Sequence, residues 1–546
     1  MKIISLLTLL CMNTLLFHLE AQTPAWEWGI SGIGNEIDES SAVTADVNGN
    51  VIVTGYFASD SITFGSTTLQ NSGPTFDESY IAKYDSSGNF LWAHAYGSSN
   101  DDKGTAITTD VSGNIYLAGY FYSPTITFGT YTLTNAGTVG DIFLVKFDPA
   151  GNVLWAKREG GPSQEIPFAV NIDVNGNIVM AGRFSSLSLT FGTYTLTQAG
   201  SMDAFIVKYD NGGNVLWATG AGGGSNDEAY AMDTDGSGNI FVAGHFNQTA
   251  TFGIFSLTTA GLSDCFYAKI NPAGVFQWAV RAGGNADDRV TDLEADANGN
   301  IYLTGYFNSP SISFGLITLN NTVQKSSFIV KIDNAGNSVW ANAVHGNCQS
   351  NGITVSGNNV ISCGTFYGDT LTFGSSQLLR EGTADIFLVN SDLAGNATWA
   401  LKQTSGGLNS ELATTICSDV NGNIFTGGYF KSSPISFGAS VLNNTDNGFD
   451  MFVAKLGNVS TGITEQASEF GPLLFPNPAG NNVSIRHETG INAVYIYNIL
   501  GMKVYTLEED GKPTLTSCNL TSLSKGIYIV LIDDGRQLFT RRLIVE

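Results

Sequence analysis

Basic residues are scarce in this sequence. Its 546 residues contain 24 lysines and arginines against 48 aspartates and glutamates, which gives a formal net charge of −24 at pH 7. Charged residues of both signs together make up only 13% of the chain. A protein that binds nucleic acid needs a basic face for the phosphates. The composition therefore argues against nucleic acid as a partner.

Long apolar stretches are missing after the first residues. Residues 1–21 contain Lys2, an apolar run from Ile3 to Phe17, and a plausible cleavage site ending at Ala21. This pattern predicts a cleaved secretory signal peptide, with an uncleaved anchor as the alternative. No later stretch is long and apolar enough to cross a membrane as a helix. We therefore expect a mature chain without a transmembrane segment.

Cysteine is rare as well. Removal of the signal peptide leaves an odd, sparse set that does not make a disulfide framework, namely Cys265, Cys348, Cys363, Cys417 and Cys518. Cys348 and Cys363 flank one predicted hairpin, so a bridge between them is one hypothesis. The alternative is that all five are small buried apolar residues.

Motifs of catalysis and metal binding are also missing. The four histidines outside the signal peptide form no His-x-x-x-His pair, and the cysteines form no Cys-x-x-Cys pair. No Gly-x-Ser-x-Gly elbow or phosphate-binding glycine-rich loop stands out. A glycosidase needs only two carboxylates, so the acidic residues leave that class open. Still, no acidic pair breaks the internal repeat in a way that indicates catalysis, and we expect neither an enzyme nor a cofactor.

Glycine is abundant, with 64 residues, and it belongs to a repeat. One unit reads Asp110-Val-Ser-Gly-Asn114, Ile115-Tyr-Leu-Ala-Gly-Tyr-Phe121, Thr127-Phe-Gly129, Asp141-Ile-Phe-Leu-Val-Lys146 and Asp148-Pro-Ala-Gly-Asn-Val-Leu-Trp155. The glycine before the Tyr-Phe pair recurs at intervals of 64, 63, 62, 61, 59 and 64 residues, as Gly55, Gly119, Gly182, Gly244, Gly305, Gly364 and Gly428. A regular period of about 62 residues predicts a stacked array of one supersecondary unit.

The tryptophan of the unit shows how the array ends. It occurs after the first six repeated glycines, as Trp92, Trp155, Trp217, Trp278, Trp340 and Trp399. The seventh can only be Trp26 or Trp28, ahead of the first complete unit. This offset predicts that the N-terminal strand completes the last unit and closes the array into a ring. An open solenoid is the alternative.

Strands are predicted in pairs within each unit. Residues 105–110 and 114–121 are joined by one Gly-Asn turn, and residues 142–148 and 152–157 by another. Both faces of the strand from Ile115 to Phe121 are apolar or aromatic, as expected for a sheet between two others. Such sheets around an axis make a β-propeller. We therefore predict an all-β protein with a seven-bladed β-propeller over residues 22–456, and expect its repeated tryptophan in the core.

The repeat resembles a bacterial β-propeller repeat (SBBP-like) family with units of the form Asp-x-x-Gly-Asn-x-Tyr-x-x-Gly and Asp-x-Phe-x-x-Lys-x-Asp-x-x-Gly-x-x-x-Trp. The resemblance spans about residues 26–456 and implies an architecture rather than an activity. The sixth unit departs from the pattern, with Ser356-Gly-Asn-Asn359 at its first turn and Asn390 in place of lysine. A ligand site repeated around the ring should be interrupted there.

The pattern changes after a polar linker over residues 457–470. Residues 471–546 contain Phe475-Pro-Asn-Pro-Ala479, Val494-Tyr-Ile-Tyr-Asn-Ile-Leu-Gly501, Gly526-Ile-Tyr-Ile-Val530 and Arg541-Arg-Leu-Ile-Val545. Alternating strands and glycine-containing turns predict a small Ig-like β-sandwich.

This tail resembles the type A C-terminal sorting domain of the type IX secretion system of Bacteroidetes. The residues that carry the resemblance are Pro476, Asn477, Pro478, Gly501, Gly526 and Tyr528. The resemblance implies passage through the periplasm, partnership with the type IX machinery, and release or tethering at the outer cell surface. A fibronectin-like domain that stays attached is the alternative.

Two features of the predicted ring are candidate binding sites. The loops after the tryptophan strands are acidic and could hold Ca²⁺ or a cationic partner, through residues that include Asp101, Asp102, Asp227, Glu228, Asp287 and Asp288. Alternatively, these carboxylates bond the backbone where each first strand begins. The second feature is the variable position after the repeated glycine, which includes Tyr120, Arg183, His245 and Tyr306. It could present aromatic and polar groups to a sugar or peptide, or it could pack between sheets.

These observations predict a secreted or surface-displayed propeller that acts as a non-enzymatic binding or adhesion module for an extracellular glycan or protein. Two alternatives are an exported hydrolase or lyase that acts on glycan and a structural component of the surface layer.

Overall fold

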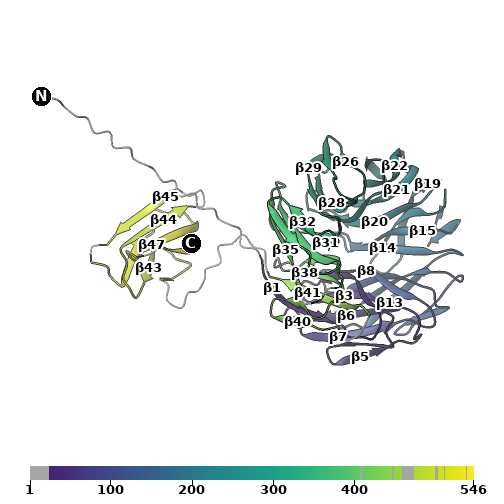
Figure 1. Ribbon diagram of the computed structural model, residues 1–546, viewed down its shortest axis with the longest axis horizontal. Coiled ribbons are helices and arrows are strands. Elements are labelled where there is room, and N and C mark those ends of the chain that lie inside the picture. Colours follow the sequence, from purple (N-terminus) through teal and green to yellow (C-terminus); the bar gives the residue numbers. More distant parts are fainter. Residues whose placement is uncertain are drawn as a thin grey trace. The chain divides into compact units, whose positions relative to one another are not determined.

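The computed structural model describes residues 24–405, 407, 409–444, 448–457, 472–498, 502–509, 511–536 and 538–545. All regular structure in this part of the chain is β-strand (Figure 1). The chain divides into two compact units, residues 1–460 and 461–546. The expected signal peptide and nearly all of the expected linker lie outside the described residues.

The larger unit is a β-propeller, in which the described residues form five four-stranded antiparallel sheets and one eight-stranded sheet that joins two such four-stranded units. The four-stranded units are called blades below. The first strands are β2 (Asp38–Ala45), β8 (Asp102–Thr109), β14 (Glu165–Ile172), β20 (Asp227–Thr234), β24 (Asp288–Ala295), β30 (Cys348–Ser356) and β37 (Glu411–Ser418). The second strands are β3 (Val51–Phe57), β9 (Ile115–Phe121), β15 (Ile178–Phe184), β21 (Ile240–Phe252), β25 (Ile301–Phe307), β31 (Asn359–Phe366) and β38 (Ile424–Phe430).

The outer half of each sheet follows the same order. The third strands are β6 (Glu78–Tyr84), β12 (Asp141–Phe147), β18 (Asp203–Tyr209), β22 (Phe255–Ile270), β28 (Ser326–Ile332), β34 (Asp385–Asp392) and β41 (Asp450–Leu456). The fourth strands are β7 (Phe90–Tyr96), β13 (Val153–Glu159), β19 (Val215–Gly223), β23 (Phe276–Ala282), β29 (Ser338–Val344), β35 (Ala397–Lys402) and β1 (Trp26–Ser31).

The last sheet is completed by the N-terminal strand, because β1 pairs with β41. Each first strand packs against the next one around the unit, and β37 packs against β2. In Figure 1 the green end of this unit accordingly lies beside its purple beginning. Trp28 faces Lys455 across the strands, as Trp92 faces Lys83 in the first sheet. The register therefore identifies Trp28, rather than Trp26, as the tryptophan of the seventh unit.

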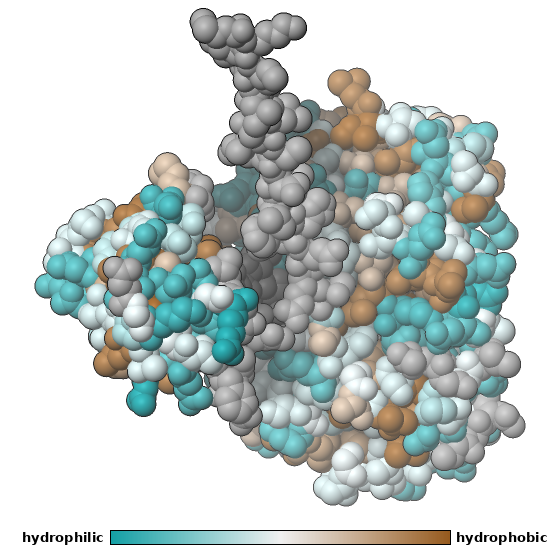
Figure 2. Space-filling model, turned by 60° about the vertical axis from the view of Figure 1, so that its left-hand side comes forward, coloured by the Kyte–Doolittle hydropathy of each residue, from teal (hydrophilic) through white to brown (hydrophobic). Residues whose placement is uncertain are grey.

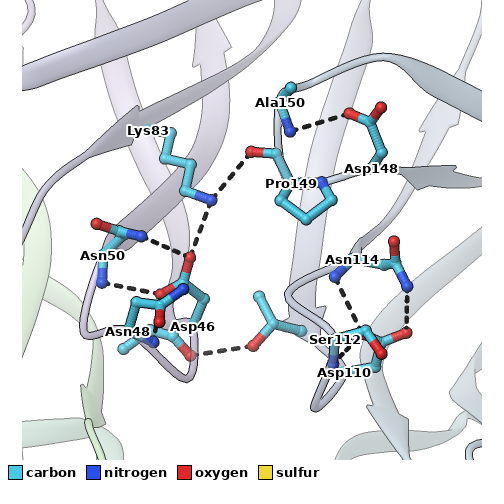
Figure 3. Close-up of polar contacts among 12 residues, drawn as sticks. Asp46, Asn48, Asn50, Lys83, Asp110, Ser112, Asn114, Asp148, Pro149 and Ala150 are labelled. Atoms are coloured by element: carbon cyan, nitrogen blue, oxygen red, sulfur yellow. Dashed lines mark hydrogen bonds and ion pairs between the residues drawn. The ribbon is translucent and has the colours of Figure 1, made fainter.

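The turns between first and second strands explain the repeated Asp-x-x-Gly-Asn sequence. One carboxylate oxygen of Asp46 accepts hydrogen bonds from the backbone N–H groups of Asn48 and Asn50, at 2.9 and 3.0 Å. Lys83 forms an ion pair of 2.9 Å with the same carboxylate and donates to the carbonyl of Pro149 in the next sheet (Figure 3). The aspartate thus fixes its own turn, while the lysine joins neighbouring blades.

The core lies between the sheets. Ile115, Leu117 and Phe121 belong to one buried cluster, and Tyr116 and Ala118 belong to the next. The two faces of β9 are therefore both buried, as the apolar character of both faces predicted. Gly119 lies where a Cβ atom would come within 2.1 Å of the Lys103 carbonyl oxygen, so only glycine fits there without displacement of the backbone.

A short hairpin, not predicted from the sequence, lies between the second and third strands of each blade. These hairpins are β4 (Ser61–Phe64) with β5 (Thr67–Gln70), β10 (Thr125–Phe128) with β11 (Tyr131–Thr134), β16 (Ser188–Phe191) with β17 (Tyr194–Thr197), β26 (Ser311–Phe314) with β27 (Ile317–Asn320), β32 (Thr370–Phe373) with β33 (Ser376–Leu379), and β39 (Ile435–Phe437) with β40 (Ser440–Leu442). In the fourth blade, extensions of β21 and β22 take this role. Residues 404–405 form the short β36, which pairs with β39.

These hairpins contact the preceding blade. Gly222 and Gly223 at the end of β19 pair with the hairpin part of β21, and Ile33 bridges to Thr63. They also present apolar side chains at their tips, such as Ile254 and Leu316. On the face seen in Figure 2, apolar residues of the larger unit form small groups among polar ones.

The hypothesis of a Cys348–Cys363 bridge is wrong. Cys348 lies opposite Phe366 and Cys363 opposite Gly352, so the two thiols do not face each other across β30 and β31. Both are free and buried, as are Cys265 and Cys518. Cys417 is also free and is half-buried.

The smaller unit consists of two sheets. One contains β42 (Leu473–Phe475), β43 (Asn482–Arg486) and β46 (Leu515–Asn519). The other contains β45 (Lys503–Glu508), β44 (Ala493–Asn498), β47 (Gly526–Asp533) and β48 (Leu538–Val545). Both sheets contribute to one apolar core, through side chains such as Val483 and Ile485 from the first and Val494 and Val530 from the second.

Candidate binding site

The first strands of the blades line a cavity of about 440 Å³ along the axis of the propeller. Strand edges carry backbone N–H and C=O groups that need partners. Side chains provide many of them: Asp292 accepts a hydrogen bond of 2.8 Å from Ile353 N, and Glu294 accepts one of 3.0 Å from Val355 N. The cavity is therefore a polar channel whose walls are tied together from blade to blade.

One end of this channel is surrounded by the variable position after the repeated glycine. Each residue at that position pairs across the sheet with the second residue of the first strand. The pairs are Glu39 with Tyr56, Lys103 with Tyr120, Ile166 with Arg183, Glu228 with His245, Arg289 with Tyr306, Gln349 with Thr365, and Leu412 with Tyr429. We call these residues the rim. The rim contains Tyr120, Arg183, His245, Tyr306 and Glu228, which the sequence analysis had drawn from two separate features.

The polar groups of the first two blades satisfy one another at the rim. The Tyr56 hydroxyl donates to Glu39 at 2.6 Å, and the Lys103 ammonium lies 3.6 Å from the centroid of the Tyr56 ring. Lys103 also forms an ion pair of 2.6 Å with Asp77. Tyr120 is half-buried, and its ring meets that of Tyr122 edge to face. This side of the rim has few groups left over for a ligand.

The third to fifth blades differ. Arg183 forms an ion pair of 2.8 Å with Glu228, across the boundary between two blades. Yet four buried side-chain atoms here have no hydrogen-bond partner among the described residues, namely Arg183 Nε, Glu228 Oε2, His245 Nδ1 and Arg289 Nε. Buried polar atoms are normally paired, so such a cluster calls for an explanation.

An aromatic pair lies beside these atoms. Thr105, Thr291 and Thr414 occupy a bulge of their first strands, and each donates to a carbonyl of the next blade, at 2.7, 2.9 and 2.7 Å. In the third and fourth blades the same position holds Phe168 and Tyr230. Their rings stack with centroids 4.3 Å apart and planes 7° apart, and both residues line the cavity.

The charges at this side of the rim are set by burial. Burial, followed by the positive charges of Arg289 and Arg183, lowers the pKa of His245 to about 3, so this imidazole is neutral at ordinary pH. Burial, followed by the charge of Arg289, also lowers the pKa of Lys325, which lies 4.2 Å from the centroid of the Tyr306 ring. Burial raises the pKa of Tyr120, Tyr230 and Tyr306.

The acidic residues at the start of the first strands make other contacts. Asp102 and Asp288 each accept hydrogen bonds from two backbone N–H groups and one serine hydroxyl. Asp227 accepts from Gly223 N and Asn247 N. These contacts correspond to the alternative in which the carboxylates bond the backbone. Asp101 accepts from Asp77 N at 3.1 Å, and Asp287 is half-buried. The described residues contain no group of three or more His, Cys, Asp or Glu placed to hold a metal ion.

Three carboxyls inside the channel were missed by the sequence analysis. Burial raises the pKa of Asp233 to about 6, of Asp292 to about 7 and of Glu294 to about 8. A comparison of the repeats could have found Asp233 and Glu294, because Thr44 and Thr108 stand at the equivalent position of the first strand in other blades. The three carboxyls support strand edges rather than forming part of the rim.

In the smaller unit the predicted motif residues come together near the end of the chain. The side-chain oxygen of Asn477 accepts a hydrogen bond of 2.9 Å from Ile544 N, between the flanking Pro476 and Pro478 and the last strand. The Tyr528 hydroxyl donates to Ser524 O at 2.8 Å, and Gly526 begins β47. Gly501 lies outside the described residues.

A family comparison identifies this unit. Residues 473–546 match the family described as secretion system C-terminal sorting domain. The tail is therefore a sorting domain of the type IX system, which indicates export to the cell surface or secretion, as the motifs predicted. Nowhere in the described residues is there a helix long and apolar enough to cross a membrane.

The propeller has more distant relatives. An uncharacterized WD repeat-containing protein of Acanthamoeba polyphaga mimivirus is 27% identical over 531 residues, which cover 78% of this chain and 38% of the relative. The chain thus spans well under half the length of that protein. The Neurospora crassa Pan2 WD40 domain is 9% identical at a TM-score of 0.39, covering 80% of this chain and 95% of that domain. A mutant puromycin hydrolase is 7% identical at a TM-score of 0.38, covering 85% and 61%. Both scores are too low to bear on function.

Proposed function

We propose that this exported propeller is a non-enzymatic binding module that holds an extracellular ligand at the rim of its channel, between the third and fifth blades. The observation that carries the proposal is the stacked pair of Phe168 and Tyr230 beside four unpartnered buried polar atoms. A bound molecule would supply the missing partners.

The departure from the repeat supports this choice of site. At the same bulge, threonine gains a hydrogen bond to the next blade, and a net hydrogen bond stabilises a protein by about 1 kcal/mol. Phe168 and Tyr230 forgo that bond in two adjacent blades. Their rings stack on each other instead, and such a pair contributes about 0.5–1.5 kcal/mol beyond its burial, so the exchange places an aromatic surface at the channel at little cost in stability.

The chemistry of the rim favours binding over turnover. The ion pair with Arg183 occupies one oxygen of Glu228, and the lowered pKa of His245 keeps that imidazole from serving as an acid near neutral pH. The channel carboxyls Asp292 and Glu294 accept hydrogen bonds from strand edges. Glycoside hydrolysis uses two carboxyl groups that act on the substrate. At the described rim, Glu39 already accepts a hydrogen bond from the Tyr56 hydroxyl and Glu228 is paired with Arg183.

The test compares the mature chain with a double variant, Phe168→Thr with Tyr230→Thr, on arrays of glycans and matrix proteins. Threonine occupies this position in three other blades, as Thr105, Thr291 and Thr414, so the variant should keep the fold. We expect the parent chain to be retained on at least one array member and the variant to lose that retention. Equal retention of both would exclude this site, and release of reaction products would favour the alternative of a hydrolase or lyase.

A further inference from the structure

Arg289 is the exception among the arginines of the propeller. Residues 24–457 contain five arginines, and four of them form ion pairs: Arg158 with Asp141, Arg183 with Glu228, Arg281 with Asp264, and Arg380 with Asp369. The side chain of Arg289 forms no ion pair or hydrogen bond with any described residue, and its Nε atom is buried. In a chain with a net charge of −24, a half-buried guanidinium without a carboxylate is unexpected.

The surroundings of Arg289 add to its positive charge. Arg289 pairs across the sheet with Tyr306, and the ammonium of Lys325 lies 4.2 Å from the centroid of the Tyr306 ring. The positive charges of Arg289 and Arg183 both lower the pKa of His245, which is neutral. His245 belongs to the fourth blade, between the blades of the two arginines.

The negative groups on this side are Glu228, which is bound to Arg183, Asp287, and the buried Asp264 and Asp288. Asp264 forms an ion pair with Arg281, and Asp288 accepts hydrogen bonds from Gly284 N and from Ser309. Among the rim residues of the third to fifth blades, two arginines therefore stand against one glutamate, which is already paired.

We propose that the ligand is an acidic glycan, and that Arg289 binds the oxyanion of one of its sugar units. This inference rests on the proposed binding function. A guanidinium presents parallel N–H donors that match a carboxylate or sulfate, which would also satisfy the buried Nε atom. The oxyanion can come from a uronic acid or from a sulfate ester, since both offer the same paired oxygens.

The neighbouring aromatic residues favour a sugar over an acidic peptide. Tyr230 and Tyr306 combine a flat apolar ring with a hydroxyl. A pyranose likewise has an apolar and a polar part, with C–H groups on its faces and hydroxyls on its edges. Convergent aromatic and polar groups of this kind are typical of sites that orient small ring-shaped ligands.

Titration calorimetry with the full mature chain tests the inference. The probes are an oligogalacturonide, its methyl ester, a sulfated galactan oligosaccharide without carboxylates, and polyglutamate. We expect the oligogalacturonide or the sulfated oligosaccharide to bind at least tenfold more tightly than the neutral ester, and added salt to weaken that binding. The stronger of the two identifies the source of the oxyanion.

The variant Arg289→Gln should lose at least tenfold in affinity for the acidic probe, and Arg289→Lys should fall between it and the parent. Arg380→Gln, which removes an arginine of the sixth blade that is paired with Asp369, serves as the control. Equal binding of acid and ester, unchanged affinity in Arg289→Gln, binding of polyglutamate alone, or no binding of any glycan would overturn the inference. The ester comparison needs no variant, so it decides the question even if Arg289→Gln does not fold. Ligand retention that depends on Phe168 and Tyr230 but not on acidity would leave the proposed function standing.

Discussion

The indole nitrogen of Trp28 donates a hydrogen bond of 3.3 Å to the backbone carbonyl of Ser86. Trp28 belongs to the strand that completes the last blade, and Ser86 lies in a turn of the first. The same bond joins other neighbouring blades, for example from Trp155 to Asn211 at 3.3 Å and from Trp278 to Asn334 at 3.2 Å. The N-terminal strand therefore repeats the contact that links successive blades elsewhere in the ring.

The variant Trp28→Ala should lower the free energy of unfolding by about 2–3 kcal/mol, because it removes a packed ring and the bond that joins the first and last blades. Chemical denaturation measures the change. Leu91→Ala, at an exposed position of a fourth strand, is the control and should be near neutral. A loss at Trp28 no larger than at Leu91 would mean that β1 contributes little to closure.

The repeat made the architecture of the larger unit predictable. Its paired turns indicate antiparallel sheets, and its tryptophan offset indicates that the N-terminal strand completes the last sheet. It did not distinguish Trp26 from Trp28, since a bulge between them shifts the register of β1 by one residue. The hairpins around the Phe-Gly pairs were missed because their strands have only three or four residues. Phe168 and Tyr230 were also missed, since no alternation pattern reveals a bulge position.

A second prediction concerns the repeated glycine. The variant Gly119→Ala should destabilise the protein by about 2–3 kcal/mol, because the added methyl group would meet the Lys103 carbonyl oxygen and the Phe143 ring. Gly224→Ala is the matched control, since nothing lies within 4 Å of the place that its added methyl group would occupy and its φ is not positive. Thermal melting of the two variants should differ clearly. Equal melting temperatures would contradict the close packing between first and second strands.

A third prediction concerns pH. A carboxyl whose pKa is raised in the folded state stabilises the fold at low pH, and this contribution is lost as the pH rises through the folded pKa. For Glu294 the folded pKa is about 8 against an ordinary 4.5. Glu294→Gln should therefore melt several degrees higher than the parent at pH 9 and at nearly the same temperature at pH 5. Glu36→Gln, at an exposed position, should show no such dependence. A constant difference at both pH values would mean that Glu294 does not ionise in this range.

A fourth prediction concerns export. Deletion of residues 471–546 should leave the propeller in the periplasm, since these residues include the sorting domain. Asn477→Ala should reduce export partially, because it removes the acceptor for Ile544 N and loosens the contact between the motif and the last strand. Immunoblots of periplasmic and extracellular fractions measure both effects. Normal amounts of the truncated protein outside the cell would show that the tail is dispensable.

The rim is proposed to bind a ligand without transforming it. Titration calorimetry with the acidic oligosaccharide tests this directly, because saturable binding and continuous turnover give different heat signals. We expect a saturable heat with one site per chain, and an affinity at least tenfold weaker in the Phe168→Thr, Tyr230→Thr double variant. Unchanged affinity in that variant, or a steady heat of reaction that persists after saturation, would contradict this proposal.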